Sequence, residues 1–415
     1  MDDSPWVRLR AMAVQLGAAP HRLFFLAGAI QLVLTQVYWM ANLAAFTVSL
    51  PGFPGAAGAN PFLAHGFLMI YGIFPFFIIG FLFTAYPRWL DGPEIPKSGY
   101  QWVFLFLASG TLFAYLGVFA FSPLLAVGAV LFLIGYLGAL RQLGRVYRLS
   151  PHPDKRHEAY VWSWLGGGAV GLALFIAGMY WGRQTWMAAA FSAALWLCLV
   201  PLTVTVCHRL IPFFSSRALP GYRMVQAAWV LPLVAVLSTG HFLLRWGFGA
   251  PWCLISDLPF LGLTLYLSIR WGLLRSFRNQ LLAMLHVGFA WLPVALALYV
   301  ARGLLSALGG SFSLGFAPLH ALGIGFLTST LLAMATRVSL GHSGRPLEAD
   351  RIAWWTFWGI GAVAVLRICS ALPWLLDWRA DLWLVTSILW LLAVIPWTWH
   401  YGALYLHPRA DGRPG

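Results

Sequence analysis

The chain has 415 residues, of which 60% are hydrophobic and 9% are charged, and its mean hydropathy is +0.78. A soluble globular protein carries roughly 25% charged residues, so this composition excludes a soluble protein or a sizeable soluble domain. The net charge of +14 does not indicate a nucleic-acid-binding protein, because the basic residues lie in short loops between apolar segments.

Apolar segments long enough to cross a lipid bilayer follow one another along the whole chain. We therefore predict an all-α membrane bundle of about twelve transmembrane helices, organised as a single transmembrane domain over residues 1–415. The expected spans are about 23–48, 62–86, 101–120, 123–140, 160–181, 186–207, 225–244, 252–270, 281–304, 314–336, 352–372 and 381–402.

The basic residues alternate between the loops in a way that predicts orientation. Of the 26 lysines and arginines, only five lie in the odd-numbered connections, and the rest lie in the even-numbered connections and the two ends of the chain. Positive charge holds loops on the cytoplasmic side, so we expect both termini in the cytoplasm. The five on the other face are Arg183, Arg245, Arg302, Arg367 and Arg379.

The four cysteines, Cys198, Cys207, Cys253 and Cys369, are scattered through apolar segments without a CxxC or CxxCH motif. This pattern argues against c-type haem, a zinc site and a disulfide framework. We expect most of these cysteines to be packing residues.

The histidines carry most of the chemistry in this sequence. Ionisable residues inside a membrane are costly and are candidates for function, and neutral imidazole is a common ligand of copper and haem iron. The predicted topology places His65, His241 and His320 on the periplasmic side, where they could form one layer. The alternative for each is a hydrogen-bonded residue at the membrane interface. The cytoplasmic side has His21, His208, His286, His342 and His400.

Histidines on spans two, six, seven and ten invite comparison with subunit I of the haem–copper oxidases, which also has twelve spans. The present chain lacks the paired histidines on span seven and the HxH on span ten that those enzymes use. The likeness is therefore distant, and the same metal set cannot be built in the same way.

Carboxylates are scarce inside the predicted spans. Asp257 is the only one well placed in apolar surroundings, where it is either a proton carrier or the mark of a break before Pro259. Asp377 and Asp381 flank Arg379, and we expect them to pair with it. No series of carboxylates suggests a proton path.

The segment at 318–347, PLHALGIGFLTSTLLAMATRVSLGHSGRPL, resembles the signature of the NnrS family. Further pieces agree in order: HRLFFLAG at 21–28, GFLFTAYPRW at 80–89, RLIPFF at 209–214 and LHVGFAWLPVALAL at 285–298. One departure is notable. Many family members have a WHAHEM-like run in span two, whereas this chain reads FLAHGFLM, with Gly66 in place of the acid.

The resemblance implies a multi-pass bacterial inner-membrane protein that is linked to nitric oxide and holds haem, of b-type, and copper. It implies haem ligation by His65, His320 or both, with His241 as a further haem or copper ligand. His286 and His342 match signature positions on the opposite face and, with His208, are candidates for a second metal site. Arg337 and Arg345 would pair with haem propionates, the alternative being that they anchor a cytoplasmic loop.

The expected role is in the response to nitric oxide and nitrosative stress, with nitric oxide as a ligand of the metals. The residues leave open whether the protein is an enzyme and which proteins are its partners. Two alternatives remain at this point: a twelve-span transporter of a metal complex or anion, and a haem-handling assembly factor for respiratory enzymes.

Overall fold

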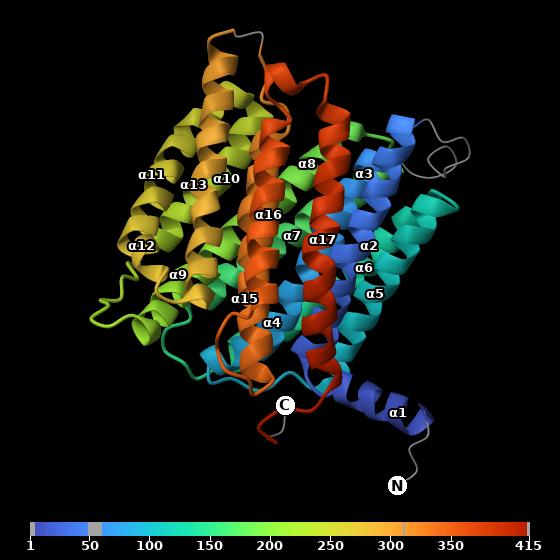
Figure 1. The fold of residues 1–415 in the computed structure, drawn as a ribbon, viewed down its shortest axis with the longest axis vertical. Coiled ribbons are helices and arrows are strands. Elements are labelled where there is room, and N and C mark those ends of the chain that lie inside the picture. The colour runs from blue at the N-terminus through green and yellow to red at the C-terminus, as the bar shows by residue number, and fades with distance from the viewer. Residues whose placement is uncertain (1–4, 49–59, 310–311, 413–415) are drawn as a thin grey trace. The chain divides into compact units, whose positions relative to one another are not determined.

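The computed structural model describes residues 5–48, 60–309 and 312–412, and within these ranges the regular structure is helical, with no strand. Twelve helices among the described residues are long and apolar enough to cross a membrane, which confirms the predicted all-α membrane bundle (Figure 1). The spans are Pro20–Phe46, Pro61–Trp89, Lys97–Phe119, Pro123–Leu149, Arg156–Tyr180, Gln184–Ala218, Val230–Gly247, Ala250–Arg270, Gln280–Ala307, Ala317–His342, Arg351–Cys369 and Arg379–Leu406.

The chain divides into two compact units, and three of the spans change unit part-way along their length. The first unit contains Met1–Phe191, Ala335–Leu347 and Val394–Gly415, and the second contains Ser192–Met334 and Glu348–Ala393. The expectation of a single transmembrane domain stays a prediction.

The first unit is built mainly from the first five spans. Its helices are α1 (Pro5–Leu16), α2 (Pro20–Val48), α3 (Pro61–Phe67), η1 (Leu68–Ile73), α4 (Phe74–Trp89), α5 (Lys97–Phe119), α6 (Pro123–Leu149), α7 (Arg156–Tyr180) and most of α8 (Gln184–Ala194). The ends of α15 (Ser329–His342) and α17 (Arg379–Leu406) complete it.

The second unit contains the centre of the chain. Its helices are η2 (Leu195–Leu199), α9 (Val200–Ala218), α10 (Val230–Gly247), η3 (Ala250–Cys253), α11 (Leu254–Arg270), α12 (Leu273–Ser276), α13 (Gln280–Ala307), α14 (Ala317–His320), η4 (Ala321–Thr328), α16 (Arg351–Cys369) and η5 (Pro373–Leu375). Within this unit α13 packs against both α11 and η4.

Spans two, six and ten are not uniform α-helices, because each contains a π-helical stretch, at η1, η2 and η4 respectively. Pro75 and Pro201 lie just after η1 and η2, where a residue without an N–H interrupts the α-helical ladder. In η4 the hydroxyl of Thr328 donates to the carbonyl of Gly323, five residues earlier. Such π-helical turns are frequent at functional sites, and His65 and His320 lie just before two of them.

The helix ends differ from the predicted spans where the chain leaves the apolar region. Span six runs on to Ala218 and span ten to His342, because a helix can continue past the hydrocarbon into a basic interfacial segment. Gly341 is still helical, and the chain turns at Gly344 with φ of +72°.

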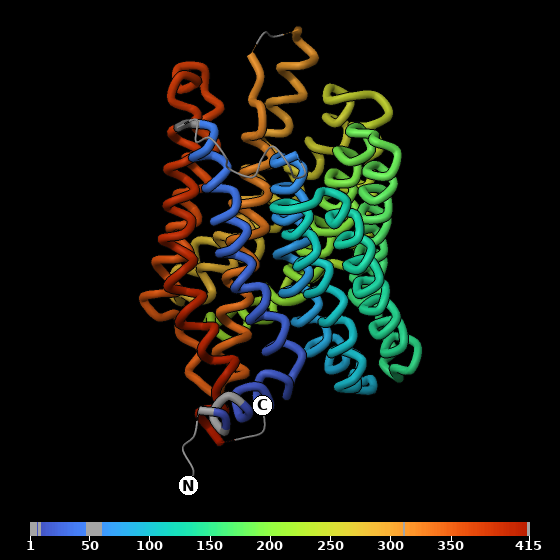
Figure 2. Tube along the Cα trace, turned by 90° about the vertical axis from the view of Figure 1, so that its right-hand side faces the viewer, coloured from blue at the N-terminus to red at the C-terminus, as the bar shows by residue number. Residues whose placement is uncertain are grey.

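The third and fourth spans form a tight hairpin in which glycines allow the two backbones to approach (Figure 2). A Cβ added at Gly128 on α6 would lie 2.6 Å from the amide nitrogen of Ala114 and from the carbonyl oxygen of Gly110 on α5. Backbone atoms cannot rotate aside, so this position requires glycine.

Gly128→Ala is therefore expected to destabilise the protein by about 1–3 kcal/mol, because the added methyl forces α5 and α6 apart. The apparent melting temperature of the detergent-purified protein measures the effect. Gly166→Ala in α7 is the matched control, since a Cβ there meets nothing within 4 Å. Equal melting temperatures for the two variants would contradict the close packing of this hairpin.

The predicted orientation is tested with reporter fusions. A fluorescent protein at the C-terminus is expected to fluoresce, because positive loops place that end in the cytoplasm. Alkaline phosphatase fused after Gly182, in the connection between α7 and α8, is expected to be active, because that enzyme folds only in the periplasm. The reverse pattern would invert the proposed topology.

Candidate functional site

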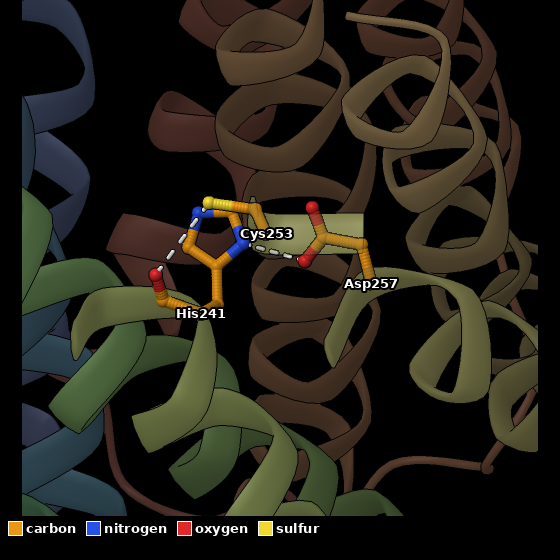
Figure 3. Close-up of side chains that lie close together, drawn as sticks. All are labelled: His241, Cys253 and Asp257. Carbon is orange, nitrogen blue, oxygen red and sulfur yellow. Dashed lines mark hydrogen bonds and ion pairs between the residues drawn. The ribbon is translucent and has the colours of Figure 1, made fainter. Parts of the chain in front are cut away.

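A helical hairpin in the second unit brings three chemically active side chains together. Helix α10 ends at Gly247, the chain reverses through Gly249 with φ of +100°, and η3 and α11 lead back. A left-handed conformation of this kind favours glycine. The reversal returns Cys253 and Asp257 to His241, and one potential ligand atom from each lies within 4.8 Å of the other two (Figure 3).

The closest contact in this cluster joins the imidazole and the carboxylate. Nδ1 of His241 lies 2.6 Å from Oδ1 of Asp257, and each residue is only 1% exposed. With Nδ1 donating to the carboxylate, the tautomer is fixed and the lone pair is on Nε2, the arrangement typical of a metal-binding histidine. The second carboxylate oxygen, Oδ2, is buried without a hydrogen-bond partner.

The thiol of Cys253 is the third donor. It is buried and makes only long contacts, 3.8 Å to the carbonyl oxygen of His241 and 3.7 Å to that of Gly249. Figure 3 draws the sulfur at the edge of the imidazole opposite to the carboxylate. Because these hydrogen bonds are weak, a metal ion could displace the thiol proton with little loss of hydrogen bonding, and the proton would be released to solvent.

Aromatic rings enclose the cluster. Trp196 from η2 stacks on the imidazole of His241 with ring centroids 3.6 Å apart, and Tyr299 from α13 meets the same ring edge-on at 5.1 Å. Arg302 lies over the ring of Tyr299, with its guanidinium carbon 4.7 Å from the centroid. The apolar rings exclude water, which strengthens electrostatic interactions inside the site.

The donor set fits a transition metal. Imidazole nitrogen, thiolate sulfur and carboxylate oxygen together suit copper or zinc, whereas calcium and magnesium prefer oxygen ligands alone. Over the described ranges, no other group of three or more His, Cys, Asp or Glu side chains is close enough to share a metal ion.

The other two predicted periplasmic histidines lie outside this cluster. His65 on α3 belongs to the first unit, and its ring stacks on Trp39 with centroids 4.0 Å apart. His320 on α14 belongs to the second unit, where its Nε2 accepts a hydrogen bond from Arg367 at 3.0 Å. The predicted layer of three histidines therefore stays a prediction.

The structure also gives a reason for the departure at Gly66. A Cβ at this position would lie 2.9 Å from the ring of Phe191 in the same unit. Phe191 packs against the backbone where an acidic side chain would begin, so the local packing matches glycine.

Two of the predicted cytoplasmic ligands lie in the second unit with different partners. His286 on α13 is buried, and its Nε2 lies 2.9 Å from the hydroxyl of Ser215 on α9. His208 on α9 packs against Trp271 with ring centroids 6.2 Å apart. Neither belongs to a group of three potential metal ligands.

His342, at the end of α15, faces His21 in the first unit with ring centroids 4.2 Å apart. The charges of Arg22, Arg88 and Arg409 act on both rings. His21 was not among the predicted ligands, although the HRLFFLAG and SLGHSGRPL motifs contain the two histidines. The order of the motifs along the chain could not reveal that they meet.

The two predicted propionate partners belong to the first unit. Arg337 on α15 is half-buried, and Arg345, beyond the helix end, is exposed. Their pairing with haem propionates stays a prediction.

The sequence singled out His241 and Asp257 separately, and Cys253 was one of four cysteines of which most were expected to be packing residues. The available signal was the short glycine- and proline-containing connection, WGFGAPWC, between two predicted spans. A connection of that length makes neighbouring helices antiparallel, so residues at similar distances from it lie at the same depth.

Ser215→Ala is expected to destabilise the protein by about 1–3 kcal/mol, because it leaves a buried imidazole nitrogen of His286 without its hydrogen bond. Ser216→Ala is the control, since that neighbouring serine is exposed. Thermal unfolding in detergent compares the two variants. If both variants unfold at the same temperature as the unmodified protein, the Ser215–His286 hydrogen bond contributes little to stability.

A protein-family model described as NnrS protein matches residues 15–409. No curated protein sequence matches the chain. The matched range contains every membrane span and all the histidines discussed above. The chain therefore belongs to the NnrS family.

Proposed function

We propose that this chain binds copper through His241 and Cys253, with Asp257 holding the imidazole in place, binds haem through other intramembrane histidines, and acts in the response to nitric oxide and nitrosative stress. The observation that carries the proposal is the buried cluster of three ligand types in the second unit. Family membership supports the same role. The proposed location is the bacterial inner membrane.

Charge balance favours a cation in the cluster. Ligation would give a thiolate and a carboxylate, two negative charges beside one neutral imidazole. Buried charges are stable only when they are paired, and a copper ion supplies the compensating positive charge. Thiolate is a soft ligand and favours Cu(I), while imidazole accepts either oxidation state of copper.

Each residue around the proposed copper site would have a distinct role. Asp257 holds His241 in one tautomer and orientation, Cys253 supplies the soft donor, and Trp196 and Tyr299 exclude water. When bound, copper would provide a redox-active centre that can take nitric oxide as a ligand.

For haem, we propose His65 and His320 as candidate ligands. The stacked contact with Trp39 fixes the ring plane of His65. At His320 the Nε2 atom accepts a hydrogen bond from Arg367, so iron ligation through this atom requires the guanidinium to move. An open coordination position on haem iron would bind nitric oxide.

Copper binding is tested by metal analysis of the purified protein. We expect about one copper per chain in the unmodified protein and loss of most of it in Cys253→Ala and His241→Ala, because each removes a donor. Cys207→Ala is the matched control, since Cys207 is a buried cysteine of the same unit outside the cluster. Copper retained by Cys253→Ala and His241→Ala would contradict the site.

The proposed haem binding is tested on the same samples, with optical spectra of the oxidised and the dithionite-reduced protein. Sharp reduced b-type bands that change on addition of nitric oxide would support it, and His320→Ala and His65→Ala would identify the ligand by loss of those bands. A folded, colourless and metal-free protein would contradict the proposal.

A further inference from the structure

Arg367, in the last turn of α16, is a buried cation in the second unit. Only 8% of the surface of Arg367 is exposed. Its Nη2 donates to Nε2 of His320 at 3.0 Å, and the guanidinium carbon lies 4.8 Å from the ring centroid of Trp383. Its Nη1 is buried and has no hydrogen-bond partner.

Among the described residues, Arg367 forms no ion pair with a carboxylate. Asp377 and Asp381, the nearest in sequence, are exposed, and Asp257 pairs with His241. A second buried arginine, Arg22 in the first unit, shows the usual solution: its Nη1 donates to the carbonyl oxygens of Tyr405 and His407. Arg367 lacks such acceptors, so its charge lacks the compensation that buried ions require.

The surroundings hold the guanidinium in place. Trp383 covers it, and the indole nitrogen of that ring donates to the hydroxyl of Ser370 at 3.1 Å. Ser370 in turn donates to the carbonyl oxygen of Arg367 at 2.8 Å. An arginine that only anchored the helix at the interface would extend into the headgroup region. The observed side chain is instead fixed against an imidazole and an indole.

We propose that Arg367 and His320 form a binding site for a small monovalent oxyanion or carboxylate. The planar guanidinium donates two parallel hydrogen bonds to a group with two oxygen acceptors, and the unpartnered Nη1 supplies one of them. A single buried positive charge matches a single negative charge. The same chemistry could come from a free anion such as nitrite or formate, or from the propionate of a bound haem.

Arg379 provides a matched control on the same ring. Its guanidinium carbon lies 5.5 Å from the centroid of Trp383, but its side chain is exposed. The expected pairing of Arg379 with Asp377 and Asp381 is wrong, because no ion pair joins these described residues and the arginine lies over Trp383 instead. Arg379→Gln therefore removes a nearby charge and leaves Arg367 and His320 themselves unchanged.

The test is a titration of the full-length detergent-purified protein with sodium nitrite and sodium formate, at constant ionic strength made up with sodium chloride. Chloride has the same charge but no pair of oxygens. Binding to the folded state raises the melting temperature in a saturable way. We expect this rise in the unmodified protein and in Arg379→Gln, its loss in Arg367→Gln, and at least tenfold weaker binding in Arg367→Lys, which keeps the charge without the fork.

Haem content measured on the same samples separates the two sources. A saturable rise with nitrite or formate that Arg367→Gln loses would support a free anion. No rise, together with less haem in Arg367→Gln and Arg367→Lys than in Arg379→Gln, would support a haem propionate. No rise and equal haem content in all variants would overturn the site. If Arg367→Gln does not fold, Arg367→Lys is compared with the unmodified protein and with Arg379→Gln instead. The titration needs no bound copper, so its outcome is independent of the proposed copper centre.

Discussion

The absence of water in the bilayer interior is the constraint on which this structure depends. Every polar group there must find a partner inside the protein, because an unsatisfied one is expensive in hydrocarbon. The backbone meets this demand with helices, and the three π-helical stretches keep it satisfied next to Pro75, Pro201 and the glycines of η4. The same demand makes each buried side chain informative. Where a buried polar atom is left without a hydrogen-bond partner, as at Nη1 of Arg367, the position becomes a candidate for a bound ligand.

Much of the fold could be predicted because the same constraint acts on local sequence. A span needs about twenty apolar residues, so hydropathy located the twelve candidate membrane spans of the described residues. The helix ends were less accessible, because helices such as the one ending at His342 continue into basic segments that hydropathy does not count as membrane. The π-helical stretches were not predicted, because the pattern of apolar residues over so few positions does not distinguish a π-helical turn from an α-helical one.

The candidate site was only partly accessible from sequence, for a different reason. Membrane depth can be inferred from topology, so His241 and Asp257 could be singled out as ionisable residues in apolar surroundings. Their hydrogen bond, and the place of Cys253 beside them, depend on how α10 and α11 rotate about their axes. Rotation is set by packing against Trp196 and Tyr299, which come from distant parts of the chain. The contact between His21 and His342 has the same origin, because it joins the beginning and the end of the matched segment.

The charged partner of an intramembrane histidine decides whether a cation or an anion is favoured beside its ring. At His241 the neighbour is a carboxylate, which raises the electron density of the imidazole and favours a cation at the opposite nitrogen. At His320 the neighbour is a guanidinium, whose positive charge favours an anion close to the imidazole. Both residues lie in the second unit and both are imidazoles inside membrane spans, so histidine position alone would assign them one role. The charges of Asp257 and Arg367 distinguish them, because a carboxylate favours a cation beside the first imidazole and a guanidinium favours an anion beside the second.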